Sequence, residues 1–124
     1  MNGKLKDLIL EGTEATPFIH CCVDEGKVEI SGRSLLNDSE VVFVQIASWV
    51  GHYIKEKTNL TFHFNFDYIN SSSNYHLLTI LKKTSRFQGL KISIDWYYED
   101  EDIHDIGLDY QELLPDLTFN FFQV

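Results

Sequence analysis

The chain has 124 residues, of which 44% are hydrophobic, so it is long enough for one buried core and too short for two ordinary domains. Its 10 basic and 19 acidic residues give a formal net charge of -9 at pH 7. Nucleic acids and anionic membrane surfaces are bound through clustered Lys and Arg, so this composition argues against both as partners. We expect a single domain over residues 1–124, whose charge serves solubility or attracts a basic patch on another protein.

The two cysteines, Cys21 and Cys22, are adjacent. Neighbouring residues of a strand point to opposite faces, so a bridge between them is disfavoured, and their spacing matches no zinc pattern. We expect one thiol in the core and one at the surface of a reduced protein. No stretch has the apolar length of a signal peptide or a membrane span, which predicts a cytoplasmic protein without membrane insertion.

The first third of the chain reads as strands. Leu5–Leu10 and Phe18–Val23 are apolar segments separated by a Thr-Pro step. A turn containing Gly26 follows, and Val28–Ile30 alternates as the return strand of a hairpin that we expect Gly32 to end.

A helix is predicted next. Apolar residues recur at helical spacing from Val42 to Ile54, which predicts an amphipathic helix of about five turns. Lys55 and Lys57 would lie in its last turn, where cations suit the helix dipole. The residues suited to capping its start are Asn37, Asp38 and Ser39.

The rest of the chain alternates strands with helices. Leu60–Asp67 has one apolar and one more polar face, and Lys91–Tyr98 has a similar alternation. Between them, a helix starts at the serines after Asn70 and ends before Gly89. A shorter helix over Ile103–Leu114, weakened by Gly107, and a final strand over Thr118–Val124 complete the chain. Helices between successive strands imply parallel crossovers, so the predicted fold class is α/β, with a mixed sheet, an N-terminal antiparallel hairpin and about three helices that cover mainly one face.

Catalytic motifs are not evident in the sequence. It has no phosphate-binding Gly-rich loop and no Gly-x-Ser-x-Gly elbow, and its histidines form no pair at zinc-binding spacing. The acidic run Glu99–Asp102, with His104 and Asp105, is a candidate for a hard cation but lacks the glycine and alternating ligands of a calcium loop. We expect a solvated acidic loop or a partner-facing acidic patch, and no metal, cofactor or enzymatic activity.

Three consecutive serines, Ser71, Ser72 and Ser73, follow a long apolar strand and precede a helix. This order places them at the carboxyl end of a sheet strand and at a helix N-terminus, where sites of open α/β sheets lie and where anions are favoured. Two interpretations stand side by side. The serines cap the helix, or one of them carries a regulatory phosphate.

Several motifs resemble a known family almost from end to end. They are Glu11-Gly-Thr13, Thr16-Pro17, Gly26-Lys-Val-Glu-Ile-Ser-Gly-Arg-Ser34, the helix carrying Trp49, Phe66-Asp-Tyr-Ile-Asn-Ser-Ser-Ser73 and Asp95-Trp-Tyr-Tyr-Glu-Asp-Glu-Asp102. With these motifs the chain resembles the SiaC-like family of bacterial biofilm-regulation phosphoproteins. The resemblance implies a STAS-like fold, similar to that of the anti-sigma-factor antagonists, and no enzymatic activity.

The resemblance also implies a partner-switch mechanism. A cognate protein kinase phosphorylates family members on a hydroxyl residue, and a PP2C-type phosphatase removes the phosphate. The unphosphorylated form binds and activates a diguanylate cyclase, so that cyclic di-GMP and biofilm formation follow the phosphorylation state. The phosphoacceptor slot falls on Ser71, where the family commonly has threonine, with Ser72 as the alternative.

The resemblance and the local chemistry suggest further contact residues around this slot. Asn70, Ser72 and Ser73 would shape the acceptor loop. Arg33 would meet a phosphate or a partner carboxylate, or form a structural ion pair. Tyr97 and Tyr98 would anchor a partner or pack against the sheet, and Trp96 would belong to the core. A constitutive adaptor in which the serines only cap, and a metal-assisted hydrolase built on the acidic run, are the competing hypotheses.

Overall fold

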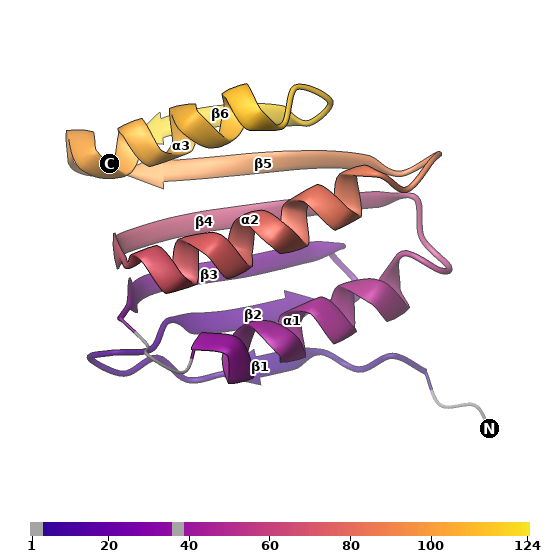
Figure 1. Ribbon diagram of the computed structural model, residues 1–124. Coiled ribbons are helices and arrows are strands. Elements are labelled where there is room, and N and C mark those ends of the chain that lie inside the picture. The colour runs from indigo at the N-terminus through magenta and orange to yellow at the C-terminus, as the bar shows by residue number, and fades with distance from the viewer. Residues whose placement is uncertain (1–3, 36–38) are drawn as a thin grey trace.

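Strands and helices alternate along the computed structural model, which describes residues 4–35 and 39–124 (Figure 1). The strands are β1 (Leu8–Leu10), β2 (Phe18–Cys22), β3 (Lys27–Ser34), β4 (Asn59–Ile69), β5 (Lys91–Tyr98) and β6 (Thr118–Gln123). The helices are α1 (Ser39–Tyr53), α2 (Ser71–Ser85) and α3 (Glu101–Leu113). The predicted caps Asn37 and Asp38 lie outside the described residues.

The strands form one six-stranded sheet in sequence order. β1, β2 and β3 pair antiparallel, whereas β3, β4, β5 and β6 pair parallel through the helical crossovers. This arrangement confirms the predicted mixed α/β fold with antiparallel N-terminal strands and three helices. No described helix combines the length and the apolar character that a membrane crossing requires.

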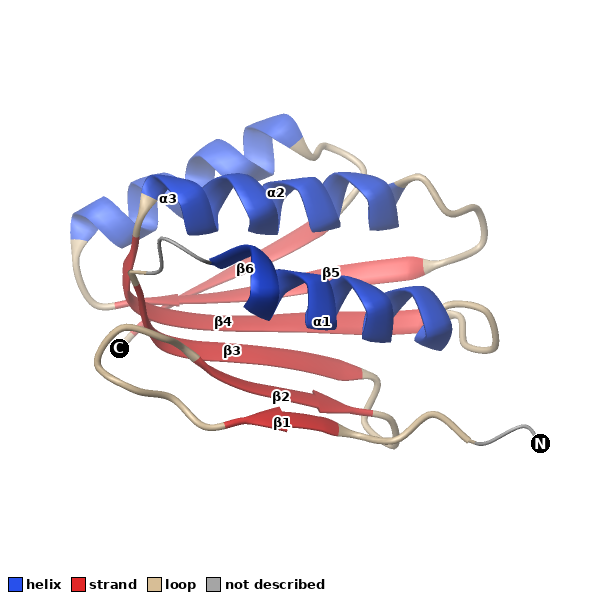
Figure 2. Ribbon diagram, turned by 60° about the horizontal axis from the view of Figure 1, so that its bottom comes forward, coloured by secondary structure: helices blue, strands red, loops and turns tan. Residues whose placement is uncertain are grey.

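All three helices lie on one face of the sheet and leave the other face open, as Figures 1 and 2 show. The core fills the space between them and includes Trp96, Tyr110, Phe43, Phe62 and Phe64, all nearly inaccessible to solvent. Successive side chains of β4 alternate between the two faces of the sheet. Phe62, Phe64 and Phe66 are buried beneath the helices, whereas His63 and Asn65 lie on the open face. The predicted one-sided coverage is confirmed.

Several predicted boundaries of the first half are wrong, beginning with the first strand, which starts at Leu8 and not at Leu5. Gly32 does not end β3, because its φ of 93° accommodates a register shift after which Arg33 and Ser34 still pair with β4. Helix α1 ends at Tyr53, so Lys55 and Lys57 lie beyond its last turn. The Tyr53 hydroxyl donates a 2.8 Å hydrogen bond to the Asn59 carbonyl, which ties the end of the helix to the start of β4.

Helix α3 begins at Glu101, two residues before the predicted start, because Asp100 caps it. The glycine expected to weaken this helix has a packing function instead. A Cβ placed on Gly107 would lie 2.6 Å from Nε1 of Trp96, so only glycine lets the helix approach the buried indole this closely. The Trp96 Nε1–H donates a 3.0 Å hydrogen bond to the Ile103 carbonyl, which holds α3 against β5.

Candidate functional site

The serine cluster lies at the carboxyl edge of the parallel strands. β4 ends at Ile69, which pairs with Ser34 of β3, and α2 begins only two residues later at Ser71. The residue between them, Asn70, donates its backbone N–H to the Ser34 carbonyl at 2.9 Å. The start of α2 is therefore anchored to the end of the neighbouring strand.

Asn70 is the N-cap of α2. Its backbone is extended, with φ -84° and ψ 172°, and its side-chain Oδ1 accepts a 2.9 Å hydrogen bond from the Ser73 N–H. This contact satisfies one of the amide groups that a helix start leaves unpaired. Asn70 is thus the residue whose side chain caps α2.

Ser73 is wholly buried and bonded to the neighbouring strand. The Ser34 hydroxyl, also buried, donates to the Ser73 hydroxyl at 2.6 Å. A buried hydroxyl pair of this kind ties α2 to β3 and offers no surface to another molecule. The expectation that Ser73 contacts a partner therefore does not fit the structure, which gives the residue an internal structural role.

A second contact fixes the first turn of α2 from the opposite side. The Tyr110 hydroxyl of α3 hydrogen-bonds to the backbone carbonyl and to the side-chain Oδ1 of Asn74. Tyr110 is 1% exposed, and this burial raises the pKa of its hydroxyl, so the group stays protonated and acts as a donor. With Ser73 bonded to β3 and Asn74 bonded to α3, the helix start is held in place on both sides.

Ser71 is the first residue of α2, and its side chain is exposed, whereas Ser72 is half-buried. The first turn of the helix contains no acidic residue. The helix dipole places positive potential at this end, and no carboxylate of that turn neutralises it. The geometry therefore presents the exposed Ser71 at a rigid position that favours an added negative charge.

Arg33 lies at the same edge of the sheet. It is exposed and pairs in register with Tyr68 of β4. It borders a cleft of about 270 Å³, together with Asp67 and Asp100 at the ends of β4 and β5. Within the part of the chain that the structure describes, Arg33 forms no ion pair, so the structure does not show the structural ion pair considered as its alternative role.

The three aromatic residues of β5 have different surroundings. Trp96 is buried in the core, as predicted. Tyr98 is half-buried and stacks on His104 of α3, with ring centroids 4.0 Å apart. Tyr97 lies on the open face of the sheet between His63 and Phe122, with centroid distances of 4.4 Å and 4.8 Å. Tyr97 is thus the tyrosine that offers its ring to the uncovered face.

The acidic run is divided by the start of α3. Asp100 accepts a 3.0 Å hydrogen bond from the Ile103 N–H, while Glu101 and Asp102 occupy the first helical turn. Among the described residues, these carboxylates do not form a cluster that could hold an ion. They serve the helix start, which explains their position without a metal.

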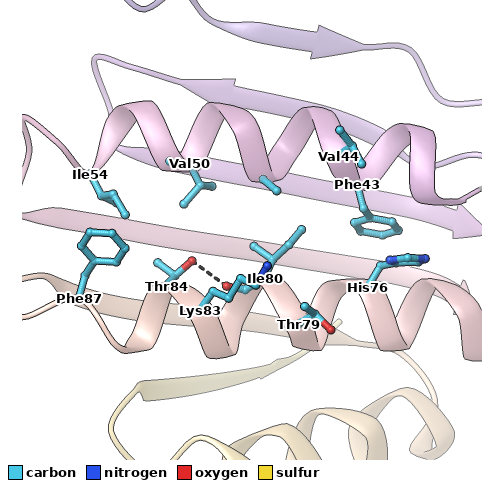
Figure 3. Close-up of a pocket in the computed structure, with 12 residues that line it drawn as sticks. Phe43, Val44, Val50, Ile54, His76, Thr79, Ile80, Lys83, Thr84 and Phe87 are labelled. Atoms are coloured by element: carbon cyan, nitrogen blue, oxygen red, sulfur yellow. Dashed lines mark hydrogen bonds between the residues drawn. The ribbon is translucent and has the colours of Figure 1, made fainter.

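An apolar groove between α1 and α2 was not predicted from the sequence. It has a volume of about 280 Å³, and side chains of both helices point into it (Figure 3). Its described lining contains no Asp or Glu, and Lys83 and His76 are its titratable groups. The exposed apolar residues Val44 and Phe87 border it, with 57% and 54% of their surface accessible. Helical periodicity marked the inner faces of these helices, but the groove depends on how the helices lie beside each other.

Comparison with known proteins gives consistent relatives. The chain is 25% identical over 122 residues to an uncharacterized protein of Pseudomonas aeruginosa strain UCBPP-PA14, PA14_02130, with 94% of each chain covered. Its fold is similar to that of a chain in the crystal structure of the diguanylate cyclase SiaD in complex with its activator SiaC from Pseudomonas aeruginosa. The TM-score is 0.86 and the sequence identity is 22%, and the match covers 95% of this chain and 100% of the other. Apo-SiaC from the same species matches with a TM-score of 0.77 and 24% identity, over 95% of this chain and 98% of the other.

A family model covers most of the chain. The model described as SiaC family regulatory phosphoprotein matches residues 10–124, which include the whole candidate site. The description is that of a regulatory protein and not of an enzyme, in agreement with the expectation from the sequence. The chain belongs to the SiaC family of regulatory phosphoproteins.

Proposed function

We propose that this chain is a phosphorylation-controlled switch that binds and regulates a target protein, with Ser71 as its phosphoacceptor. A protein kinase adds the phosphate, a PP2C-type phosphatase removes it, and the unphosphorylated form binds the target. The observation that carries the proposal is the exposed Ser71 at the start of a capped, anchored helix whose first turn has no acidic residue. Membership of a family of regulatory phosphoproteins supports it independently.

Electrostatics explains why a phosphate at Ser71 would be tolerated and would change the binding of a partner. A phosphoserine carries about two negative charges at neutral pH, and the N-terminus of a helix stabilises an anion. Tyr75 lies one turn further along α2 with 68% of its surface accessible. The phosphate would thus change the charge beside an exposed aromatic residue without disturbing the core.

The proposed target is a diguanylate cyclase, because a structural relative, SiaC of Pseudomonas aeruginosa, is the activator bound to the diguanylate cyclase SiaD. Asn70 and Ser72, which flank the proposed acceptor, and Arg33, which lies at the same edge of the sheet, are proposed contact residues. Tyr97 and Tyr98 are proposed as further contacts, Tyr97 on the open face beside His63 and Tyr98 where it stacks on His104.

The groove between α1 and α2 is the proposed docking surface for the target. Its apolar lining fits an apolar segment of another protein, and Lys83 fits a carboxylate flanking that segment. The described lining of the groove contains no carboxylate, so an acidic residue beside the apolar segment would meet Lys83 without repulsion from a neighbouring acid. A second copy of this chain fits less well, because two-fold pairing of the grooves would bring the two Lys83 side chains together without a carboxylate between them.

The experiment that tests the phosphoacceptor is intact mass analysis with phosphopeptide mapping, on protein purified from its own cells in the presence of phosphatase inhibitors. Wild-type protein should carry one phosphate on Ser71, and Ser71→Ala should carry none. Ser72→Ala is the matched control and should be phosphorylated as the wild type is. Phosphate retained in Ser71→Ala and lost in Ser72→Ala would move the acceptor to the neighbouring serine.

Binding measurements separate the switch from the constitutive adaptor. A diguanylate cyclase of the same organism should bind unphosphorylated protein more tightly than stoichiometrically phosphorylated protein, and equal affinities would favour the adaptor. Val44→Glu in the groove should weaken this binding and leave phosphorylation of Ser71 unchanged. Leu113→Glu on α3, a residue with similar exposure, is the control that should bind normally.

A further inference from the structure

Three side chains that play no part in the proposed switch meet on the open face of the sheet at its β1–β2 edge. The potential ligand atoms of Asp7, His20 and Cys22 all lie within 4.8 Å of one another. A carboxylate, an imidazole and a thiol together form a donor set that suits zinc, in contrast to the all-oxygen sets that calcium and magnesium prefer.

Strand pairing brings these residues together. Ile9 pairs with His20 and Leu8 with Cys21, so the antiparallel register continues to place Asp7 opposite Cys22. His20 and Cys22 are two residues apart on β2 and therefore share a face, whereas Cys21 between them is buried on the other face. The cluster is thus formed by two residues of β2 and by the residue that directly precedes β1.

The distances within the cluster are compatible with tetrahedral coordination. Nε2 of His20 lies 3.3 Å from Oδ2 of Asp7. Zinc with bonds of about 2.0 to 2.3 Å separates the ligand atoms of a tetrahedron by roughly 3.3 to 3.8 Å. The two atoms are therefore already spaced as a zinc ion would require, and the Cys22 sulfur lies within 4.8 Å of both.

The carboxylate is held in position by the backbone. Oδ1 of Asp7 accepts a 2.9 Å hydrogen bond from the Val23 N–H, which leaves Oδ2 directed toward His20. Such an outer hydrogen bond is what orients ligands in known metal sites.

We infer that Asp7, His20 and Cys22 bind one zinc ion, with solvent completing the tetrahedron. The carboxylate and a Cys22 thiolate together balance the charge of the ion, and a neutral His20 supplies the third ligand. Because two ligands come from β2 and one from the residue before β1, a bound ion would fasten the edge strand to the sheet.

The site is tested by titrating the reduced full-length chain, without a polyhistidine tag, with Co²⁺. We expect one ion per chain, with a thiolate-to-cobalt charge-transfer band and the intense d–d bands of four-coordination, all abolished by added Zn²⁺. Zn²⁺ should also raise the melting temperature of the wild type. Absence of the thiolate band in folded protein at excess Co²⁺ would overturn the inference and leave Asp7 and His20 as an ion pair only.

Matched variants assign the ligands. Cys22→Ser should remove the thiolate band, and Asp7→Asn and His20→Gln should weaken Co²⁺ binding. His52→Gln, which changes an exposed histidine on α1, should bind Co²⁺ as the wild type does. An unchanged thiolate band in Cys22→Ser would also overturn the assignment, since the signal would then come from Cys21. Circular dichroism of each variant checks that it is folded. If Cys22→Ser does not fold, Co²⁺ binding by His20→Gln tests the site instead.

Discussion

Helices α2 and α3 begin in the same way but differ in charge. Each follows a parallel strand, and each is capped by the side chain of an Asn or Asp that accepts the N–H of the residue three positions later. The distances are 2.9 Å from Asn70 to Ser73 and 3.0 Å from Asp100 to Ile103. The first turn of α3 contains two carboxylates, whereas the first turn of α2 contains none.

The difference shows which of two similar helix starts can accept an anion. The positive end of the α3 dipole already faces carboxylates that belong to the chain, so a further negative charge there would be repelled. The corresponding end of α2 has only serines, one of them exposed. This contrast favours the serine cluster over the acidic run as the regulatory site.

The largest expected effect comes from breaking the attachment of α3. Gly107→Ala should lower the free energy of unfolding by about 2–3 kcal/mol, because the added Cβ would overlap the Trp96 indole. Denaturant unfolding measures the change. Gly51→Ala in α1, where nothing lies within 4 Å of the new Cβ, is the control and should stabilise by about 0.5–1 kcal/mol. Equal stabilities of the two variants would contradict this packing of α3.

Removing the caps compares the two helix starts directly. Asn70→Ala and Asp100→Ala should each cost about 1 kcal/mol of stability, since each leaves a helical N–H without its acceptor. Asp100→Ala also removes a negative charge from the positive end of α3, so its cost should shrink as salt is added. Urea unfolding at low and high ionic strength should show this salt dependence for Asp100→Ala and none for Asn70→Ala.

The smallest expected effect comes from exchanging the charge between the two helix starts. Ser71→Asp should stabilise the protein and Asp102→Ser should destabilise it, each by about 0.3–1 kcal/mol at low salt. Thermal unfolding of the two variants beside the wild type measures both signs. Changes of the same sign in the two variants would argue against the electrostatic contrast between α2 and α3.

The sequence by itself determined the order of elements and the place of the serines. Alternation of side chains gave β5 its observed bounds, Lys91–Tyr98, and separated the buried and open faces of β4. A helix that starts directly after a parallel strand must have its first residues at the carboxyl edge of the sheet. Ser71 could therefore be placed there before any coordinates were known, because local backbone geometry decides these features.

Only the tertiary structure decided which residues meet across the chain. Ser73 appeared equivalent to Ser71, but it is buried against Ser34, 39 residues earlier. Gly107 appeared to be a weak point of a helix until the position of Trp96 showed the close packing that requires it. Such contacts depend on register and on the packing of whole elements, which the periodicity of a single segment does not encode.

The proposed zinc-ligand cluster and the groove also depend on contacts between separate segments of the chain. Sequence spacing did not reveal this cluster, because its members come from two segments, Asp7 before β1 and His20 and Cys22 on β2. The groove exists only because α1 and α2 lie side by side on one face of the sheet (Figure 3). Local patterns in the sequence determine each strand and helix, whereas surfaces built from two elements arise only when the sheet has assembled.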